Sequence, residues 1–350
     1  MARRRAKGKK KRGSGFARFT RWALLVLLVI LLAGAGGGAW LLLWPYGPQT
    51  ETFVDLEPGS SAVRIGKQLQ DLGIVRSQYA FYLLRAWKRG TLRAGEYRFD
   101  HREPALEVYQ KIARGEVYTR ALTVPEGANI FDIAARVEEA GFDTRPNFLA
   151  AAVSEAALVS DLDPEAKSLE GYLFPDTYRF ARHTRSAQIV AAMVRRFRVV
   201  AQELGLKENV HRVVTIASLV ERETAVDSER SLVASVFENR LKQKMPLMTD
   251  PAVIYGLELE GHWRGTIYSS DLARDTAYNT YRHAGLPPGP VANPGVPSLK
   301  AAMNPADSNY LYFVAAGRNA QGHSRFSETL DEHNRNVAGY RRELKKAGGQ

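Results

Sequence analysis

The longest apolar segment of the chain extends from Trp22 to Trp44 and contains no charged residue. As a helix rising about 1.5 Å per residue, it would be roughly 34 Å long, which is enough to cross a bilayer. Tryptophan at both ends and at Trp40 is typical of membrane–water interfaces. The pattern therefore predicts one transmembrane helix. The alternative is a cleaved signal peptide with its cleavage site near Ala33–Ala35, but the apolar run continues past that point.

After a short Pro/Gly linker at 45–48, the apolar positions contain an internal repeat with a period of 68 residues. The corresponding positions are Val54–Gly59, Ile65, Leu69 and Gly73 in the first copy and Leu122–Gly127, Ile133, Val137 and Gly141 in the second. Each copy predicts a short strand, a Pro-Gly turn and an amphipathic helix closed by glycine. Such units loosely resemble LysM glycan-binding modules, and a plain α+β scaffold is the alternative.

The remaining pattern predicts a strand at 92–99 and a helix at 105–115, followed by a predominantly helical region from about residue 146. Helices are expected at 147–159, 184–204 and 213–224. A strand at 310–314, a hairpin partner at 322–327 and a helix at 328–346 close the chain. We expect an α+β protein made of a basic tail (1–21), a transmembrane helix (22–44), a duplicated strand-helix region (45–145) and a mixed α/β catalytic domain (146–345).

The net charge of +12 is concentrated at one end of the chain. Residues 1–21 hold ten Arg or Lys residues and no acidic residue, which leaves only +2 for the rest. The positive-inside rule places this tail in the cytoplasm and the body of the protein outside. A nucleic-acid partner or an ATP-dependent activity is therefore not expected. The chain has no cysteine, no His or Cys at metal-ligand spacing and no phosphate or dinucleotide motif, so neither a metal nor a cofactor is predicted.

The segment Val213–Thr224 combines helical apolar spacing with two carboxyl groups near its end. Helical geometry puts Glu223 in register with Val220 and Ile216, on the side expected to be buried. Burial raises the pKa of a carboxyl group, which is the state that a general acid needs near neutral pH. Glu221 is expected on a more open flank. The alternative is that both glutamates simply end a helix in solvent.

Two regions combine aromatic and polar residues in a way that suits a sugar ligand. Ser168–Phe180 contains four aromatic residues and two acids, and aromatic faces beside hydrogen-bonding groups match a sugar ring. The alternative is a core hairpin filled by these rings. Leu247–Gly256 and the segments 277–281, 285–290 and 293–295 are turn-rich and not periodic, which predicts irregular, functional structure.

Seven ordered blocks of the chain resemble signature segments of the MltG/YceG family, the endolytic murein transglycosylases of the bacterial cytoplasmic membrane. The blocks are Leu169–Tyr178, Ile216–Thr224, Val236–Leu241, Thr249–Pro251, Tyr278–Tyr281, Gly285–Gly289 and Tyr310–Val314. The resemblance covers roughly residues 50–345, with a less typical segment at 257–276 and a long basic tail. In this family the second glutamate of the Val-Glu-x-Glu-Thr block is catalytic, which implies Glu223.

The resemblance implies a lytic transglycosylase, which needs one carboxyl group where most glycosidases use two. Glu223 would protonate the oxygen between N-acetylmuramic acid and N-acetylglucosamine and then accept the proton of the C6 hydroxyl, leaving a 1,6-anhydro end. Thr224 beside it resembles the second residue of the Glu-Ser pair of other lytic transglycosylases. Candidates for supporting the acid or contacting sugar are Glu221, Glu170, Tyr172, Asp176, Tyr178, Asp250, Tyr278, Asn279 and Tyr281.

The implied substrate is the nascent peptidoglycan glycan strand, cut internally on the outer (periplasmic) side of the membrane so that strands are released or terminated. The synthases that make these strands are the expected protein partners. Two other readings stay open. One is a two-carboxylate muramidase with Asp250 or Glu221 as the second group, which would leave reducing ends. The other is a membrane-tethered glycan-binding protein built on the repeat at 54–141, which would cut nothing.

Overall fold

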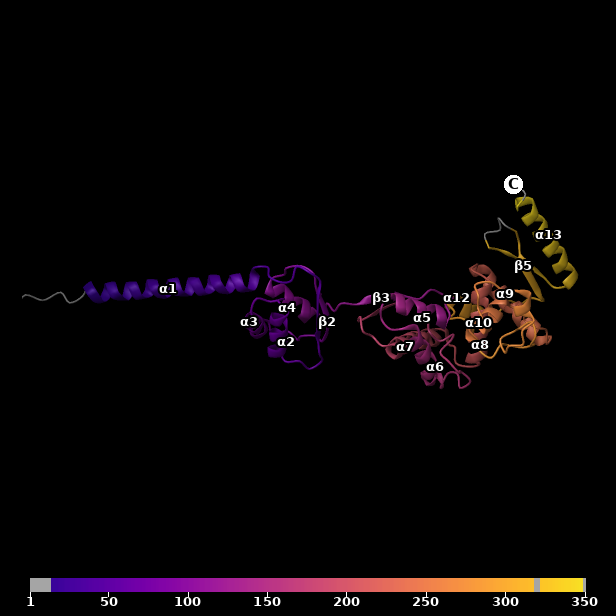
Figure 1. Cartoon of the computed structure of the whole chain (residues 1–350), viewed down its shortest axis with the longest axis horizontal. Coiled ribbons are helices and arrows are strands. Elements are labelled where there is room, and N and C mark those ends of the chain that lie inside the picture. Colours follow the sequence, from indigo (N-terminus) through magenta and orange to yellow (C-terminus); the bar gives the residue numbers. More distant parts are fainter. Residues whose placement is uncertain (1–13, 318–321, 349–350) are drawn as a thin grey trace, which may run out of the picture. The chain divides into compact units, whose positions relative to one another are not determined.

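The computed structural model describes residues 14–317 and 322–348, and the chain divides into two compact units, Met1–Thr119 and Arg120–Gln350. The first unit begins with the helix α1, Ser14–Leu43 (Figure 1). Its stretch Arg18–Leu43 is apolar and long enough to cross a membrane, and none of it is buried in the protein. The predicted apolar helix is confirmed, although it begins earlier than expected, within the basic segment.

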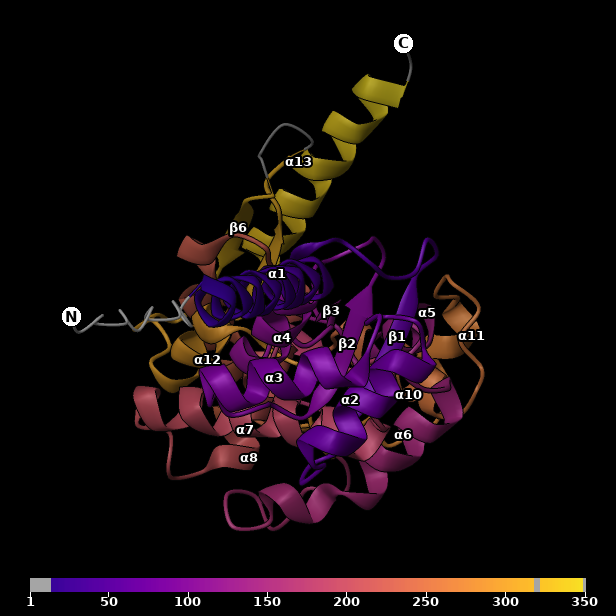
Figure 2. The same ribbon diagram turned by 90° about the vertical axis from the view of Figure 1, so that its left-hand side faces the viewer.

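The rest of the first unit packs three helices around a two-stranded sheet (Figure 2). Its elements are β1 (Thr52–Leu56), α2 (Ala62–Asp71), α3 (Gln78–Lys88), β2 (Gly95–Phe99) and α4 (Ala105–Arg114). The strands are antiparallel, with Val54 opposite Tyr97. Both side chains are buried, and Leu69 of α2 and Phe81 of α3 share their core. Burial of these large apolar groups is what holds the unit together.

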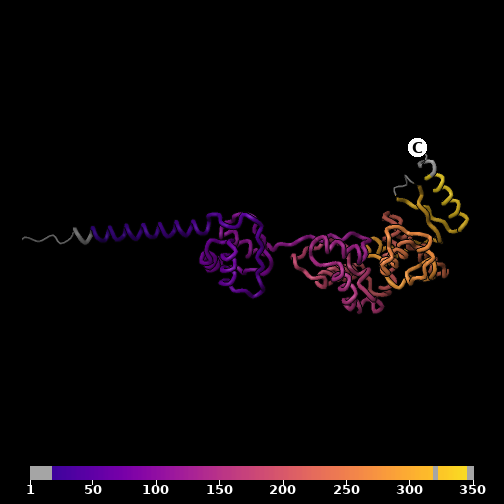
Figure 3. The backbone as a smooth tube through the Cα atoms, in the orientation of Figure 1, coloured from indigo at the N-terminus to yellow at the C-terminus, as the bar shows by residue number. Residues whose placement is uncertain are grey.

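The second unit is mainly helical, as predicted, and carries two antiparallel strand pairs, β3 with β4 and β5 with β6. Figure 3 traces the path of its backbone. Its strands are β3 (Arg120–Thr123), β4 (Thr177–Phe180), β5 (Tyr312–Ala315) and β6 (Ser324–Ser327). Its helices are α5 (Ile130–Glu139), α6 (Arg145–Ser154), α7 (Ser186–Leu204), α8 (Val210–Glu223), α9 (Arg230–Lys242), α10 (Asp250–Leu259), α11 (Ser269–Leu272), α12 (Val296–Met303) and α13 (Leu330–Gly348), with 3-10 turns at Ala156–Val159 and Asp227–Glu229.

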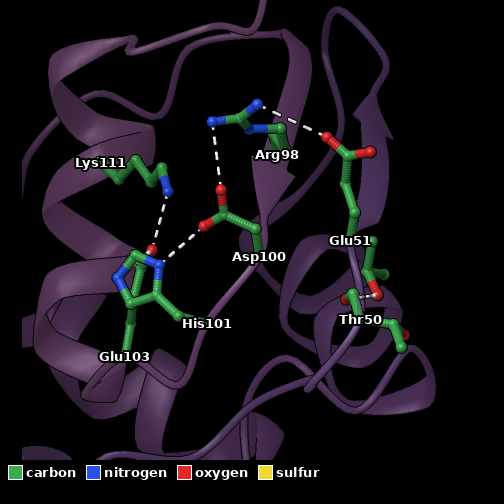
Figure 4. Close-up of polar contacts among 8 residues, drawn as sticks. Thr50, Glu51, Arg98, Asp100, His101, Glu103 and Lys111 are labelled. Atoms are coloured by element: carbon green, nitrogen blue, oxygen red, sulfur yellow. Dashed lines mark hydrogen bonds and ion pairs between the residues drawn. The ribbon is translucent and has the colours of Figure 1, made fainter.

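Ion pairs cover the exposed side of the first unit's sheet (Figure 4). The Arg98 guanidinium lies 3.5 Å from the Glu51 carboxylate and 3.1 Å from that of Asp100. Nearby, the Lys111 ammonium lies 2.8 Å from the Glu103 carboxylate. The two Arg98 pairs are exposed and add little stability, whereas the Lys111–Glu103 pair is largely buried. The Arg98 pairs mark this side of the sheet as a surface that faces water.

The internal repeat gives two strand-turn-helix segments, but not one duplicated domain. Glycines Gly73 and Gly141 follow α2 and α5 with φ of 67° and 70°, the left-handed conformation expected after a helix. The two copies, however, belong to different compact units, and β3 pairs with β4 at Thr177–Phe180 instead of with a strand of the first copy. A LysM-like duplicated region over 45–145 is therefore not confirmed.

Helix α8 occupies the centre of the second unit. It is buried on every side from Val214 to Val220, and α9, α10 and α12 pack against it. Ala217 and Ser218 allow close approach, and the Ser218 hydroxyl accepts a hydrogen bond from the Val291 N–H at 3.0 Å. The helix therefore delivers its last residue, Glu223, from a rigid core.

The segment Leu247–Gly256, which we expected to be irregular, contains most of α10, so that prediction is wrong. Thr249 caps the helix by accepting the Ala252 N–H at 3.4 Å, and Pro251 lies in the first turn, where a missing N–H costs nothing. At Gly256 a Cβ atom would come within 3.0 Å of the Tyr278 Cβ atom. Pro251 and Gly256, which suggested a turn, instead lie at the start of a helix and at a close contact with Tyr278.

Candidate active site

A pocket of about 470 Å³ lies where α8 ends, and residues from distant parts of the second unit form its wall. Glu223 comes from α8, Arg240 from α9 and Asp250 from the start of α10. Tyr281 lies in the loop after α11 and Tyr312 on β5. Three of the residues predicted from the sequence, Glu223, Asp250 and Tyr281, are therefore brought together here.

Glu223 has the properties of a general acid. It is the last residue of α8 and is partly buried, and within the described parts of the chain its carboxyl group has no hydrogen-bond partner. Burial raises its pKa to about 7, the nearby negative charge of Asp250 adds to the rise, and Arg240 and Arg222 oppose it. The carboxyl group is therefore protonated in a substantial fraction of molecules at neutral pH and is open to a ligand in the pocket.

Asp250 and Tyr281 form a hydrogen-bonded pair in the same pocket as Glu223. The Tyr281 hydroxyl donates a hydrogen bond to Asp250 Oδ1 at 2.7 Å, and burial followed by this contact raises the Tyr281 pKa. The neighbouring Thr280 holds the loop in place, because its hydroxyl accepts the Thr249 N–H at 2.9 Å. The pair therefore presents a rigid carboxylate at a set place in the pocket.

Arg240 shapes the same pocket, and our sequence reasoning gave it no role. Its guanidinium donates hydrogen bonds to the carbonyl groups of Leu311 and Leu247, both at 2.7 Å, and lies 5.3 Å from the centre of the Tyr312 ring. These contacts tie β5 and the loop before α10 to α9. The Val236–Leu241 block that carries the family resemblance includes this arginine, and that block was the only signal for it in the sequence.

His333 of α13 also lines the pocket and was not predicted. Its ring stacks on Tyr312 with the ring centres 5.1 Å apart. Burial, with the charge of Arg240 adding to it, lowers the His333 pKa, so the ring is neutral at physiological pH. Nothing in the polar pattern of its helix distinguishes this residue, and only the fold brings it to the site.

Glu221 is not on an open flank, and that expectation is wrong. Its side chain is 5% exposed and its carboxylate lies 2.9 Å from the guanidinium of Arg230, which is itself 6% exposed. The Gly295 N–H donates to its other oxygen at 2.9 Å. The reason is the start of α9, which brings Arg230 against this side of α8. Thr224 is buried, and its hydroxyl accepts the Val226 N–H at 3.1 Å, so it closes the helix end.

Three other predicted residues line a second pocket, of about 340 Å³, which His211 at the start of α8 also lines. Glu170 is buried there and accepts hydrogen bonds from the Ile130 N–H at 2.9 Å and the Asn293 side-chain amide at 2.8 Å, and burial raises its pKa to about 8. The Tyr172 hydroxyl donates to Asp163. Burial raises the pKa of Tyr278 to about 12.

The last three predicted residues lie outside the walls of both pockets. Asp176 forms an exposed ion pair with Arg196 at 2.9 Å. The Tyr178 hydroxyl donates to the Phe174 carbonyl group at 2.5 Å, and the Tyr178 ring stacks on that of Phe180. The buried Asn279 amide donates to the carbonyl groups of the turn at 271–274. Their observed contacts are those of a scaffold.

Comparison with known proteins identifies the family of the chain. The model of the YceG-like family matches residues 54–339. An endolytic murein transglycosylase of Bacillus subtilis is 34% identical over 327 residues, covering 85% of this chain and 89% of that protein. One of Streptococcus pneumoniae is 30% identical, covering 90% of this chain and 64% of that protein.

A solved structure has a similar fold. The crystal structure of a putative yceG-like protein from Listeria monocytogenes superposes with a TM-score of 0.53 at 30% identity. The match covers 82% of this chain and 99% of that one. Both the family model and the relatives cover far more than half of the sequence. The chain belongs to the YceG-like family.

Proposed function

We propose that this chain is an endolytic murein transglycosylase in which Glu223 is the catalytic acid and base. The observation that carries this proposal is the carboxyl group of Glu223 in the pocket at the end of α8, which is partly buried and has no hydrogen-bond partner among the described residues. The names of the relatives from B. subtilis and S. pneumoniae supply the substrate, murein, and the internal position of the cut. A pKa of about 7 suits a group that must both give and take a proton.

The reaction uses Glu223 twice. In the first step its proton goes to the oxygen linking N-acetylmuramic acid to N-acetylglucosamine, the C1–O bond breaks, and the N-acetylglucosamine side leaves as an alcohol. The acetamido group of the substrate supports the positive charge at C1. In the second step the Glu223 carboxylate takes the proton of the C6 hydroxyl, whose oxygen bonds to C1. A 1,6-anhydro ring forms, no water is consumed, and Glu223 is protonated again.

Asp250 and Tyr281 assist this chemistry by electrostatics. The Asp250 carboxylate raises the Glu223 pKa, which keeps the acid protonated until the substrate arrives. The same negative charge favours the oxocarbenium-like state at C1. Tyr281 holds the carboxylate by its 2.7 Å hydrogen bond. Arg240 keeps the opposite walls in position through its two backbone contacts.

The proposal includes a single-pass anchor. Helix α1 is long and apolar enough to span a membrane, and the Arg and Lys residues before it favour a cytoplasmic N-terminus. The catalytic unit then lies on the outer face, where nascent strands leave their synthases. Those synthases are the proposed partners, and release or termination of strands is the proposed role.

The experiment that tests the chemistry compares the full-length protein in detergent with Glu223→Gln and Glu221→Gln on uncrosslinked glycan strands. Mass spectrometry of the products reports the new ends. We expect 1,6-anhydro ends from the wild type and from Glu221→Gln, assayed below its unfolding temperature, and none from Glu223→Gln. Glu221→Gln is the matched control, because the same change is made two positions away in an ion pair.

Other products would change the conclusion in defined ways. Reducing ends would make the enzyme a hydrolase and would direct attention to Asp250, the second carboxylate in the pocket. Loss of anhydro ends in a folded Glu221→Gln protein, with Glu223→Gln still active, would reject Glu223. Strands left intact by the wild type would reject the activity altogether.

A further inference from the structure

Helix α3 of the first unit exposes an apolar stripe that its own fold does not explain. Tyr79, Leu83 and Trp87 are 66%, 59% and 68% exposed. They are four residues apart, so they lie along one side of the helix. The neighbouring side carries Phe81 and Leu84, which are fully buried in the core. The core accounts for the buried side, and the exposed side needs a second apolar environment.

Helix α3 lies next to the end of the apolar helix α1. α3 contacts α1, and Leu41 and Leu42 near the end of α1 pack against the core of the first unit. The Arg76 guanidinium, just before α3, lies 4.2 Å from the centre of the Trp40 ring. Both views show α3 on the side of the unit from which α1 leaves (Figures 1 and 2). A bilayer around α1 would reach this side first.

The charges on and after α3 are all positive. Arg85 and Lys88 lie in its last turn and Arg89 is its C-cap, and the helix contains no Asp or Glu. Lys88 Nζ lies 4.4 Å from the centre of the Trp87 ring. Within the described residues none of the three forms an ion pair, in contrast to Arg98 of β2 and Lys111 of α4 (Figure 4). Apolar and aromatic residues beside unpaired cations are typical of a helix lying in a membrane interface.

We propose that α3 lies in the outer membrane–water interface, with Tyr79, Leu83 and Trp87 among the lipids and Arg85, Lys88 and Arg89 on anionic phospholipid headgroups. The inference rests on the proposed membrane anchoring by α1. The first unit is then held at two places, by α1 through the bilayer and by α3 on its surface. This fixes its orientation on the membrane, where a tether alone would let it turn.

The absence of cysteine allows a direct test with single labelled positions in the full chain. Leu83→Cys carries an environment-sensitive fluorophore, and the protein is reconstituted into vesicles of phosphatidylcholine and phosphatidylglycerol. Spin-labelled lipids quench from the bilayer, and iodide quenches from water. We expect blue-shifted emission and strong lipid quenching at position 83. Asp55→Cys, an exposed position on β1, is the control and should be quenched by iodide only.

A third label at Ile30 in α1 separates the two ways in which the inference can fail. Lipid quenching at Ile30→Cys but not at Leu83→Cys would overturn the α3 proposal and keep the anchor. Quenching at neither position would reject the anchor itself. A label at 83 that is shielded from lipid and iodide alike would mean that another protein surface covers the stripe, which also overturns the proposal.

A double variant tests the proposed contact of the α3 cations with anionic headgroups. Lys88→Glu combined with Arg89→Glu changes two exposed side chains that have no ion-pair partner in the part of the chain that the structure describes. The fold should therefore be kept, which circular dichroism can verify. We expect weaker lipid quenching at position 83 in this variant. We also expect weaker lipid quenching at position 83 when the protein without these two substitutions is placed in vesicles of phosphatidylcholine alone. Equal quenching in all these cases would show apolar insertion without recognition of anionic lipid, and would overturn that part of the proposal.

Discussion

The two pockets of the second unit each contain a carboxyl group whose pKa is raised by burial, yet the two groups are held differently. Glu170 is surrounded by donors: the Ile130 N–H and the Asn293 amide bind its two oxygens at 2.9 Å and 2.8 Å. Glu223 has no such partner in the described parts of the chain and faces a pocket. A raised pKa alone therefore does not identify a catalytic acid. The free hydrogen-bonding capacity of Glu223 is what separates it from a structural carboxyl group.

The sharpest test of this difference is Glu223→Gln. A general acid contributes about 10²–10⁴-fold to a rate, so we expect kcat to fall by that amount. The melting temperature should stay close to that of the wild type, because no hydrogen bond is broken. Mass spectrometry of the products measures kcat, and thermal unfolding followed by circular dichroism measures the melting temperature. A variant that is unstable but active would reverse the roles assigned to the two glutamates.

Glu170→Ala should lower stability and keep activity, which is the opposite of the result expected for Glu223→Gln. Two buried donors lose their acceptor at a cost of about 1–3 kcal/mol each, so we expect a loss of about 2–6 kcal/mol in the free energy of unfolding. Activity per folded molecule should stay near the wild-type value. Urea unfolding measures the first quantity, and rates on refolded protein measure the second. An unchanged unfolding midpoint would show that the two hydrogen bonds do not hold the loops together.

The pH dependence of stability provides the control for Glu170. Burial raises its pKa from 4.5 to about 8, so the folded state favours the protonated form. Its contribution to stability is complete below pH 4.5 and is lost as the pH rises through 8. Glu170→Gln, which keeps the shape and carries no titrating proton, should remove this part of the pH dependence. A Glu170→Gln profile parallel to that of the wild type would contradict the raised pKa.

A smaller effect is expected from the neighbour of the acid. Because Glu223 must be protonated to act, kcat/KM should fall as the pH rises through about 7. Asp250 raises the Glu223 pKa, so Asp250→Asn should move this fall to lower pH. Profiles of kcat/KM between pH 5 and 9, recorded for the wild type and for Asp250→Asn, measure this shift. A shift to higher pH, or none, would remove Asp250 from the electrostatics of the acid.

The sequence predicted the parts of this site that depend on neighbouring residues. The three-four spacing of apolar residues was sufficient to predict the central helix, and with it the raised pKa of Glu223, because both follow from one helix entering a core. The seven blocks predicted the family. The turn chemistry of Pro251 and Gly256 was misread, because both residues also occur at helix starts and at close helix contacts.

The remaining features depend on long-range contacts that no local pattern contains. Glu221 is buried only because Arg230 arrives from the next helix and Gly295 from a loop much further along. The repeat has the local form of two equal copies, but β3 finds its partner in β4 at 177–180. His333 and Arg240 reach the pocket from α13 and α9. Tertiary contacts, not local propensity, decided these cases.

The smallest predicted effect comes from the Asp250–Tyr281 pair in the pocket of the acid. Tyr281→Phe removes the hydrogen bond to Asp250 while the ring still fills its place. A bond of this kind is worth about 0.5–1.5 kcal/mol, so we expect kcat to fall by about two- to twelve-fold. Tyr178→Phe removes an equivalent hydroxyl outside both pockets and should leave kcat unchanged. Equal effects of the two variants would mean that Tyr281 acts through stability alone, and that the fixed position of Asp250 does not contribute to catalysis.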